Sequence, residues 1–407
     1  MTNTKDEVDQ PNVKRVNGYT INGHNVPSAG ERNAWEGPGP AAFDFRSDTV
    51  TSPTTSMLAA TQSCTLLDDV FAEDPTTISL ERFIADLTGM EAALFMTSGT
   101  MGNQLSIRSA LNGPPHSVLA DSRSHVIAWE AGGLASTSLA MPIPVMPSNG
   151  HHLSLSDVQK HACLSDDTHF APTRLISLEN TLGGTILPLS VCRSISHWSR
   201  SLPPEQRIWL HLDGARLWEA VAAGAGTLKE YCECFDSVTM CFSKGLGAPI
   251  GSVIAGNKKF ITKARHLRKM MGGGLRQSGV VTASARTAVE ETFLGGKLAA
   301  THAQAKEVQR MWESRGGRIE HPVETNMVWL DLDSAGISRE RFVEEGVKEG
   351  LKLLGGRVVV HYQICAEAVE ALGRVMDRVL VDGRGERWEV MKGEKRQARE
   401  NMKVEVE

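Results

Sequence analysis

Short apolar runs of strand length alternate with longer amphipathic segments through the middle of the chain. The runs are Ala92–Met96, Leu175–Leu178, Ile208–Leu212, Ser237–Phe242 and Gly251–Ala255. The first of them is followed by Thr97-Ser98-Gly99-Thr100 and then by a segment of helical character, Met101–Leu111. Alternating strands and helices are typical of a mostly parallel sheet that helices cover on both faces. We therefore predict an α/β fold for this part of the chain.

The pattern changes after residue 297. Leu298–Arg315 has helical character and ends at Gly316-Gly317, which indicates a connection to a second unit. Beyond it the pattern indicates two strands, Met327–Leu332 and Arg357–His361, and two helices, Arg339–Gly350 and Cys365–Val381. This mixture predicts a small α+β domain. The predicted organisation is a flexible tail over 1–42, a large domain over 43–297, a small C-terminal domain over 298–382 and a charged tail over 383–407.

Polar residues follow several of the predicted strands, namely Ser98, Asn180, Asp213 and Lys244. Sites in open α/β sheets lie beyond the carboxyl ends of the strands. A lysine at the end of a buried strand loses hydration, which favours the neutral and nucleophilic amine. An amine for a Schiff base and a carboxylate for a pyridine nitrogen are what pyridoxal phosphate chemistry requires. Taken alone, however, Lys244 is more often a solvated surface charge, and Asp213-Gly214 is more often a turn.

Ser98-Gly99-Thr100 lies between a predicted strand and a predicted helix. Free N–H groups and the helix dipole at this point can hold a phosphate, and the two hydroxyl groups add donors. The simpler alternative is an ordinary N-cap, for which Ser and Thr are favoured residues.

Three further segments contain residues that could act in catalysis or bind an anion. His125 can stack on a pyridine ring and accept a proton near neutral pH, or it can be a partly buried structural histidine. Lys269 and Arg276 flank the glycine cluster Gly272–Gly274, which is either a flexible surface loop or a phosphate-binding loop. Arg357 can clamp a carboxylate through its planar guanidinium, or it can be a surface arginine at a strand start.

Composition narrows the class of protein. With 407 residues, of which 41% are hydrophobic and 22% charged, the chain matches an ordinary globular protein of more than one domain. A net charge of −5 without a basic stripe argues against nucleic acid as a partner. No apolar stretch is long enough to cross a bilayer, so no membrane partner is expected. The polar segment 1–40 is neither a secretory signal nor an arginine-rich transit peptide, and we expect a cytoplasmic protein.

The seven cysteines are odd in number and scattered. Cys232-Glu233-Cys234 has the wrong spacing for a zinc knuckle and lacks a second half. We therefore expect reduced thiols with structural roles and no metal site.

Taken in order, these motifs resemble the threonine aldolase family, in the β-eliminating-lyase-like branch of fold-type I pyridoxal phosphate enzymes, with the character of its fungal members. The resemblance runs from about Phe43 to about Val381. The matching segments are Phe45–Thr51, Leu67–Phe71, Glu73–Thr76, Ser98–Thr100, His125 with Glu130–Gly133, Leu178–Thr181, His211–Arg216, Ser243–Gly247, Gly272–Gln277 and Arg357–His361.

The resemblance implies a fold-type I architecture and the cofactor pyridoxal 5'-phosphate. It implies that Lys244 forms the Schiff base, that Asp213 pairs with the pyridine nitrogen and that His125 stacks on the ring. The residues implied for the phosphate are Ser98, Gly99, Thr100 and Ser243, with Lys269 and Arg276 from a neighbouring subunit. Those implied for the substrate carboxylate are Ser47, Arg216 and Arg357, with Arg216 also near the ring oxygen. A homodimer or homotetramer with active sites at the subunit interface is implied as well.

The reaction implied is retro-aldol cleavage of L-threonine, L-allo-threonine and related L-3-hydroxy amino acids to glycine and an aldehyde. Two departures from the family pattern bear on it. Many members have a histidine thought to contact the substrate hydroxyl where this chain has Leu182, and a tyrosine where it has Phe71. With Leu182 unable to act as a base, His125, directly or through water, is the candidate acceptor of the hydroxyl proton.

Two alternatives stay open at this point. Some fungal relatives of the family act as alanine racemases, and racemisation needs no contact to a hydroxyl group, which Leu182 would permit. The second alternative is a non-catalytic interaction protein that kept the fold. Loss of Lys244 or Asp213 would indicate this, and both residues are present.

Overall fold

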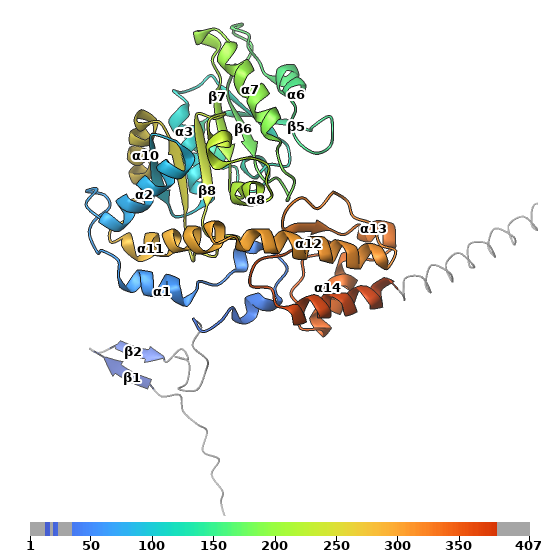
Figure 1. The fold of residues 1–407 in the computed structure, drawn as a ribbon. Coiled ribbons are helices and arrows are strands. Elements are labelled where there is room, and N and C mark those ends of the chain that lie inside the picture. The colour runs from blue at the N-terminus through green and yellow to red at the C-terminus, as the bar shows by residue number, and fades with distance from the viewer. Residues whose placement is uncertain (1–12, 17–18, 23–34, 381–407) are drawn as a thin grey trace, which may run out of the picture.

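The computed structural model of the chain describes residues 13–16, 19–22 and 35–380. The predicted charged tail over 383–407 lies outside the described residues. Within the predicted N-terminal tail, β1 (Val13–Val16) and β2 (Tyr19–Asn22) pair as an antiparallel hairpin (Figure 1). The apolar pattern did not indicate this pairing.

A seven-stranded sheet forms the centre of the larger unit, in the order β3-β9-β8-β7-β6-β4-β5. The strands are β3 (Ala92–Met96), β4 (Ser117–Asp121), β5 (Met141–Val145), β6 (Thr173–Glu179), β7 (Trp209–Asp213), β8 (Ser237–Cys241) and β9 (Ser252–Gly256). Strand β9 is antiparallel to both of its neighbours, and the pairs from β8 through β5 are parallel. The predicted mostly parallel sheet is confirmed. Strands β4 and β5 were not predicted. Strand β5 carries Pro142 and Pro144, which oppose a strand assignment but which an edge strand tolerates.

Alternation along the strands decides what each face of the sheet contacts. In β3, Leu94 and Met96 belong to a cluster with α3 (Gly99–Ala110) and α10 (Lys258–Met270), whereas Phe95 belongs to the main core on the opposite face. The other helices of this unit are α1 (Thr55–Gln62), α2 (Pro75–Thr88), α4 (His125–Ala128), α5 (Gly133–Ser138), α6 (Leu155–His161), α7 (Leu189–Ser201), α8 (Leu217–Ala222), α9 (Leu228–Cys232) and α11 (Gly279–Ala288). The sheet is thus covered on both faces, as the alternating pattern predicts.

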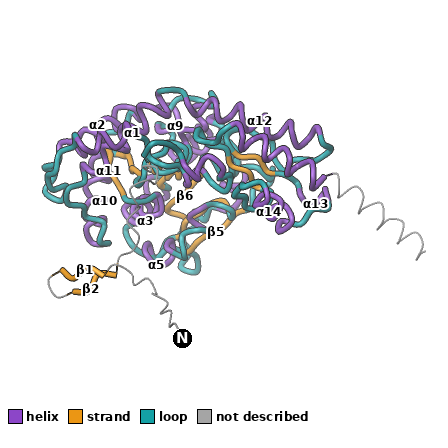
Figure 2. The backbone as a smooth tube through the Cα atoms, turned by 90° about the horizontal axis from the view of Figure 1, so that it is seen from below, coloured by secondary structure: helices purple, strands orange, loops and turns teal. Residues whose placement is uncertain are grey.

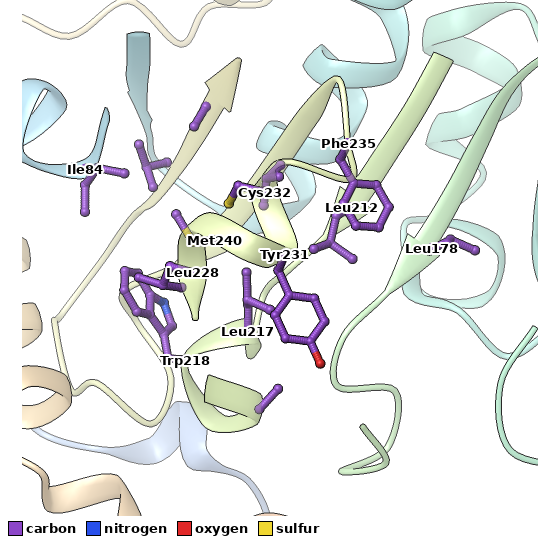
Figure 3. Close-up of a cluster of buried hydrophobic side chains, with 14 of the residues drawn as sticks. Ile84, Leu178, Leu212, Leu217, Trp218, Leu228, Tyr231, Cys232, Phe235 and Met240 are labelled. Carbon is purple, nitrogen blue, oxygen red and sulfur yellow. The ribbon is translucent and has the colours of Figure 1, made fainter. Parts of the chain in front are cut away.

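The main core fills the space between the sheet and its helices on one face. Leu212 from β7, Leu217 from α8 and Tyr231 from α9 lie together in it (Figure 3). The Tyr231 hydroxyl donates to the carbonyl oxygen of Leu187 at 3.0 Å, so this ring is buried without losing its hydrogen bond. The core anchors the turns that follow β7 and β8, and these turns carry the candidate site.

The C-terminal unit begins with the long helix α12 (Lys297–Ser314). Its elements are β10 (Met327–Trp329), α13 (Leu332–Ala335), α14 (Arg339–Lys348), β11 (Arg357–Val359) and a helix over residues 366–380, with β10 and β11 antiparallel. Figure 2 shows this unit at one end of the molecule, around α13 and α14, with α10 and α11 at the other. Phe45, which the sequence placed at the start of the large domain, is buried in the core of the C-terminal unit beside Trp312 and Val358. The domain boundaries therefore stay a prediction, with the entering chain shared between the two units.

All seven cysteines lie in the described part of the chain and are free. No helix among the described residues is long and apolar enough to cross a membrane. The cytoplasmic location stays a prediction.

Candidate active site

Polar residues at the carboxyl ends of β6, β7 and β8 meet the amino terminus of α3 around one cavity of about 360 Å³. The predicted site residues that line it are Ser98, Gly99, Thr100, His125, Asp213, Arg216, Ser243 and Lys244. The strands bury their apolar residues in the core, so the first polar residue after each strand emerges at this edge. Motifs that are far apart in the sequence are therefore brought together as the parallel sheet predicts.

Lys244 lies in the turn after β8, and glycines hold this turn in place. The carbonyl oxygen of Lys244 accepts hydrogen bonds from the N–H of Gly247 and from the Thr51 hydroxyl, both at 2.9 Å. A Cβ at Gly245 would lie 2.5 Å from Oε1 of Glu219, and Gly247 has a φ of +89°. Only glycine fits both positions. The glycines thus fix the backbone from which the lysine side chain enters the cavity.

Asp213 and His125 are joined by a hydrogen-bonded chain of buried side chains. The Nδ2 group of Asn103 donates to Oδ2 of Asp213 at 2.7 Å and to Oε1 of Glu130 at 2.9 Å. The same oxygen of Glu130 lies 2.8 Å from Nδ1 of His125. The backbone N–H of Ala215 donates to the other oxygen of Asp213 at 3.1 Å. The chain fixes the orientation of both side chains predicted to contact a pyridine ring.

His211 fixes the orientation of the Asn103 amide. Burial lowers the pKa of His211 to about 4, so the ring is neutral at pH 7. Its Nδ1 lies 3.0 Å from the Ser237 hydroxyl and its Nε2 lies 3.3 Å from Oδ1 of Asn103. With Oδ1 turned to the histidine, Nδ2 of Asn103 points toward the two carboxyl groups.

The amino terminus of α3 can both be capped and bind an anion. The Ser98 hydroxyl accepts from the N–H of Met101 at 3.1 Å, so the N-cap interpretation is correct. Within the described residues, no hydrogen bond engages the N–H groups of Gly99 and Thr100, and both residues line the cavity. A Cβ at Gly99 would lie 2.7 Å from Sγ of Cys241, so glycine lets the helix start this close to β8. These two N–H groups remain the candidate phosphate donors.

Arg216 makes a bidentate ion pair with Asp48. Its Nε lies 2.7 Å from Oδ2 and its Nη2 lies 2.6 Å from Oδ1 of Asp48, which is fully buried. Burial alone would raise the pKa of Asp48, but the Arg216 guanidinium lowers it to about 2. Two donors of Arg216 are therefore occupied within the chain, which leaves Nη1 for a ligand.

Arg357 lies beside this ion pair, although it does not line the described cavity. Its Nη2 donates to the carbonyl oxygen of Arg46 at 2.9 Å, while its buried Nε has no hydrogen-bond partner among the described residues. Burial and the charge of Arg216 lower the pKa of Arg357. A guanidinium held near another cation with a free donor favours the arrival of an anion.

The other predicted residues, Ser47, Lys269 and Arg276, are not among those that line the cavity. The Ser47 hydroxyl accepts from the N–H of Thr49 at 3.2 Å and caps a short turn. Arg276 is exposed and pairs with Asp68 at 2.9 Å, and Lys269 is near the end of α10. Their proposed role from a neighbouring subunit stays a prediction.

The two departures from the family pattern lie in different surroundings. Leu182 lines a second cavity, of about 20 Å³, next to the first, together with His151 and His152. Phe71 has 70% of its surface exposed. Neither side chain contributes a polar group to the main cavity.

Three residues that were not predicted as site residues line the cavity or pair with its residues: Asn103, Asp48 and Glu179. Each stood within or beside a quoted motif, and the polar residue at the end of β6 was a usable signal. The roles of these residues depend on which partners the sheet and α3 bring together, and the order of the motifs does not show this.

Comparisons with known proteins agree with this geometry. The model of a family described as "Beta-eliminating lyase" matches residues 44–335. The chain is 56% identical to "Aldolase vrtJ" of Penicillium aethiopicum, over 86% of this chain and 89% of the relative. It is 46% identical to "Alanine racemase TOXG" of Cochliobolus carbonum (86% and 90%) and 45% identical to the low specificity L-threonine aldolase of Saccharomyces cerevisiae (81% and 84%).

Solved structures share the fold. A putative L-allo-threonine aldolase from Listeria monocytogenes matches with a TM-score of 0.67 at 25% identity, over 85% of this chain and 98% of that one. A serine palmitoyltransferase that carries pyridoxal phosphate matches with a TM-score of 0.63 at 16% identity, over 84% and 87%. The second likeness concerns the fold alone.

Proposed function

Because the chain belongs to the beta-eliminating lyase family, we propose that it cleaves L-3-hydroxy amino acids, chiefly L-threonine and L-allo-threonine, to glycine and an aldehyde. The predicted fold-type I architecture is confirmed, and the chain is a lyase that depends on pyridoxal phosphate. One observation carries the proposal: a single cavity holds an amine, a carboxylate and a helix amino terminus, at Lys244, Asp213 and Gly99.

The residues present fit the cofactor. Lys244 offers the amine, Asp213 the carboxylate for a pyridine nitrogen, and the free N–H groups of Gly99 and Thr100 the phosphate donors. A volume of about 360 Å³ lies within the range of small-molecule sites. When bound, pyridoxal phosphate supplies an aldehyde for covalent attachment of an amine and a ring that accepts an electron pair from the α-carbon.

His125 can take the proton of a substrate hydroxyl. We assign its Nδ1–H as the donor to Oε1 of Glu130, because a carboxylate oxygen accepts. Nε2 of His125 then has a free lone pair. The ring is 38% exposed and lines the cavity, so this nitrogen is accessible to a bound substrate. The hydrogen bond that sets the tautomer thus prepares a general base.

Arg216 and Arg357 can hold the substrate carboxylate. Asp48 neutralises Arg216, while Nε of the neighbouring Arg357 has no hydrogen-bond partner in the part of the chain that the structure describes. A carboxylate between the two would satisfy that donor and relieve the repulsion between the guanidinium groups. Holding the carboxylate there would orient the bonds of the α-carbon.

A second copy of the chain is the proposed partner. Leu66, Phe71 and Met270 expose 61%, 70% and 68% of their surface. Leu66 and Phe71 stand two or three residues from Asp69, whose N–H donates to the carbonyl oxygen of Arg276 at 3.0 Å. An apolar surface next to the cations expected to complete a neighbouring site supports a homodimer or homotetramer. Light scattering of the purified protein tests this proposal, and a monomer would contradict it.

The function is tested with the full chain loaded with pyridoxal phosphate. We expect acetaldehyde release from L-allo-threonine or L-threonine, coupled to alcohol dehydrogenase for detection. Lys244→Ala should abolish both the turnover and the covalent attachment of the cofactor while the fold, followed by circular dichroism, is retained. Absence of acetaldehyde from both substrates, or unchanged turnover in Lys244→Ala, would refute the proposal.

Alanine racemisation is the second candidate. It is favoured by the apolar Leu182, which contributes no contact to a hydroxyl group, and by the likeness to the alanine racemase of Cochliobolus carbonum. Chirally resolved assays with L-alanine and L-threonine side by side separate the two functions. Formation of D-alanine without aldehyde release would assign the chain to racemisation.

A further inference from the structure

Glu179 is a carboxyl group of the site that the proposed function leaves without a role. It ends β6 and pairs in register with Asp213 at the end of β7, so the two side chains leave neighbouring strands at the same edge. Both line the main cavity. Oε2 of Glu179 accepts the backbone N–H of His125 at 2.7 Å. Within the described residues, no hydrogen bond engages the other oxygen, Oε1.

Glu179 also lines the smaller cavity of about 20 Å³ beneath Leu182. The carboxyl group therefore stands between the cofactor cavity and this second space. Its lining includes four leucines together with polar groups of Asp121, Glu179 and Thr185, and a cavity of this size with polar partners has room for about one water molecule. His151 is exposed and His152 is half-buried, so the small cavity lies close to the protein surface. A proton that leaves Glu179 therefore has a short path through the small cavity to solvent.

The surroundings of Glu179 favour its protonated form. Burial first, and the carboxylate of Asp213 second, raise the pKa of Glu179, against the opposing charges of Lys244 and Arg216. The other ionisable groups that face it are His125, Arg123, Asp121, His151 and His152. Burial and the Asp213 carboxylate outweigh the cations, so the protonated form of Glu179 is favoured as long as no ligand brings a positive charge to Asp213.

We propose that Glu179 is a proton-holding residue of this site, which carries a proton in the cofactor-free protein and releases it when a protonated pyridine ring pairs with Asp213. A positive charge at Asp213 offsets the repulsion that this carboxylate exerts on Glu179, which is the second cause of the raised pKa after burial. The O–H bond of Glu179 then breaks, the proton passes to water and no electron is transferred. The inference deepens the proposed function, because it concerns the same site, but it depends on cofactor binding and not on the identity of the substrate.

The experiment counts protons as pyridoxal phosphate binds to the apo protein. Calorimetric titrations at pH 7 in buffers of different ionisation enthalpy give the number of protons released or taken up. Glu179→Gln keeps an acceptor for the His125 N–H but cannot titrate. We expect this variant to release fewer protons than the wild type, by up to one per site, and Glu179→Asp to restore part of the difference.

Glu81 provides a matched control. It accepts the backbone N–H of Phe95 at 3.0 Å, and burial raises its pKa, but it does not line the cavity. Glu81→Gln should give the wild-type proton count. An identical count for wild type and Glu179→Gln would overturn the proposal.

A second measurement covers the case in which Glu179→Gln does not bind the cofactor. Difference titration of the apo proteins between about pH 6 and pH 9 should show one more proton lost from the wild type than from the variant, and superimposable curves would overturn the proposal. Neither measurement contains substrate. A failure of aldehyde release therefore leaves the proton count intact, and an unchanged proton count leaves the proposed function standing.

Discussion

The ion pair between Asp48 and Arg216 gives a prediction whose magnitude follows from the structure. Asp48→Asn keeps the shape of the side chain and removes its charge. The Arg216 side chain, only 16% exposed, then loses its bidentate partner. The pKa of Asp48 falls from 3.8 to about 2 in the folded protein. At about 1.36 kcal/mol per pKa unit, this fall corresponds to about 2.4 kcal/mol of stability.

The pH dependence has a definite sign. Because the folded-state pKa of Asp48 is depressed, its contribution is fully present above the unfolded value of 3.8 and is lost as the pH falls toward about 2. We therefore expect the wild type to exceed Asp48→Asn in stability by a constant amount between about pH 5 and pH 8. The difference should shrink below about pH 4.

Urea unfolding of the apo proteins, followed by tryptophan fluorescence, measures the difference. Asp44→Asn is the matched control, because Asp44 pairs at 2.6 Å with Arg46, whose side chain is 44% exposed. An exposed partner stays solvated, so this variant should lose only about 0–1 kcal/mol. If Asp48→Asn were no less stable at pH 7 than Asp44→Asn, or if its deficit persisted in acid, the reasoning would be wrong.

Three further predictions concern the site. Gly245→Ala places a Cβ 2.5 Å from a buried oxygen of Glu219 and should weaken cofactor binding at least tenfold, because it shifts the turn that carries Lys244. Gly37→Ala is the control, since a Cβ there has nothing within 4 Å and should leave the affinity unchanged. Equal cofactor affinity of the two variants in titrations of the visible absorbance would contradict this prediction. Asn103→Ala removes the 2.7 Å hydrogen bond that its Nδ2 donates to the carboxylate of Asp213. We expect the free energy of unfolding to fall by about 1.5–3 kcal/mol or more and cofactor binding to weaken. Urea unfolding and the same absorbance titration measure the two effects. Phe71→Glu puts a charge on the exposed apolar surface and should both shift the assembly toward monomers and lower the cofactor affinity. Light scattering measures the assembly and the same titration measures the affinity. Loss of assembly with unchanged affinity would show that the site is complete in one chain.

Most elements of the sheet were predictable because apolar runs of strand length are a local signal. The predicted strand Ala92–Met96 is found as β3 with the same bounds, β7 is shifted by one residue at both ends, and β8 ends one residue earlier than predicted. Two strands, β4 and β5, were not predicted. The two prolines of β5 oppose a strand assignment, and only its place at the sheet edge makes them acceptable, whereas β4 is buried along its whole length and contains no proline. The antiparallel direction of β9 is likewise a property of the folded sheet and has no local signal.

In the candidate site, too, some features have a local signal in the sequence and others depend on the folded structure. Lys244, Asp213 and Ser98 follow strands, so their position at one edge could be predicted from the order of the motifs. Asn103 was not predictable, because its role depends on α3 placing its amide between two carboxyl groups. For Arg216 the family resemblance implied a contact to the substrate carboxylate, and only the fold shows that two of its donors are paired with Asp48.

The sequence by itself determined the kind of chemistry: an amine and a carboxylate at strand ends, a helix start that can bind phosphate, and a family pattern that identifies the cofactor. These follow from residue type and order along the chain, which local periodicity preserves. The tertiary structure decided how each group is held and which charges surround it, including the hydrogen-bonded side chains from His125 to Asp213 and the burial that raises the pKa of Glu179. Such properties depend on burial and on charges contributed by distant segments, and only the folded chain brings these together.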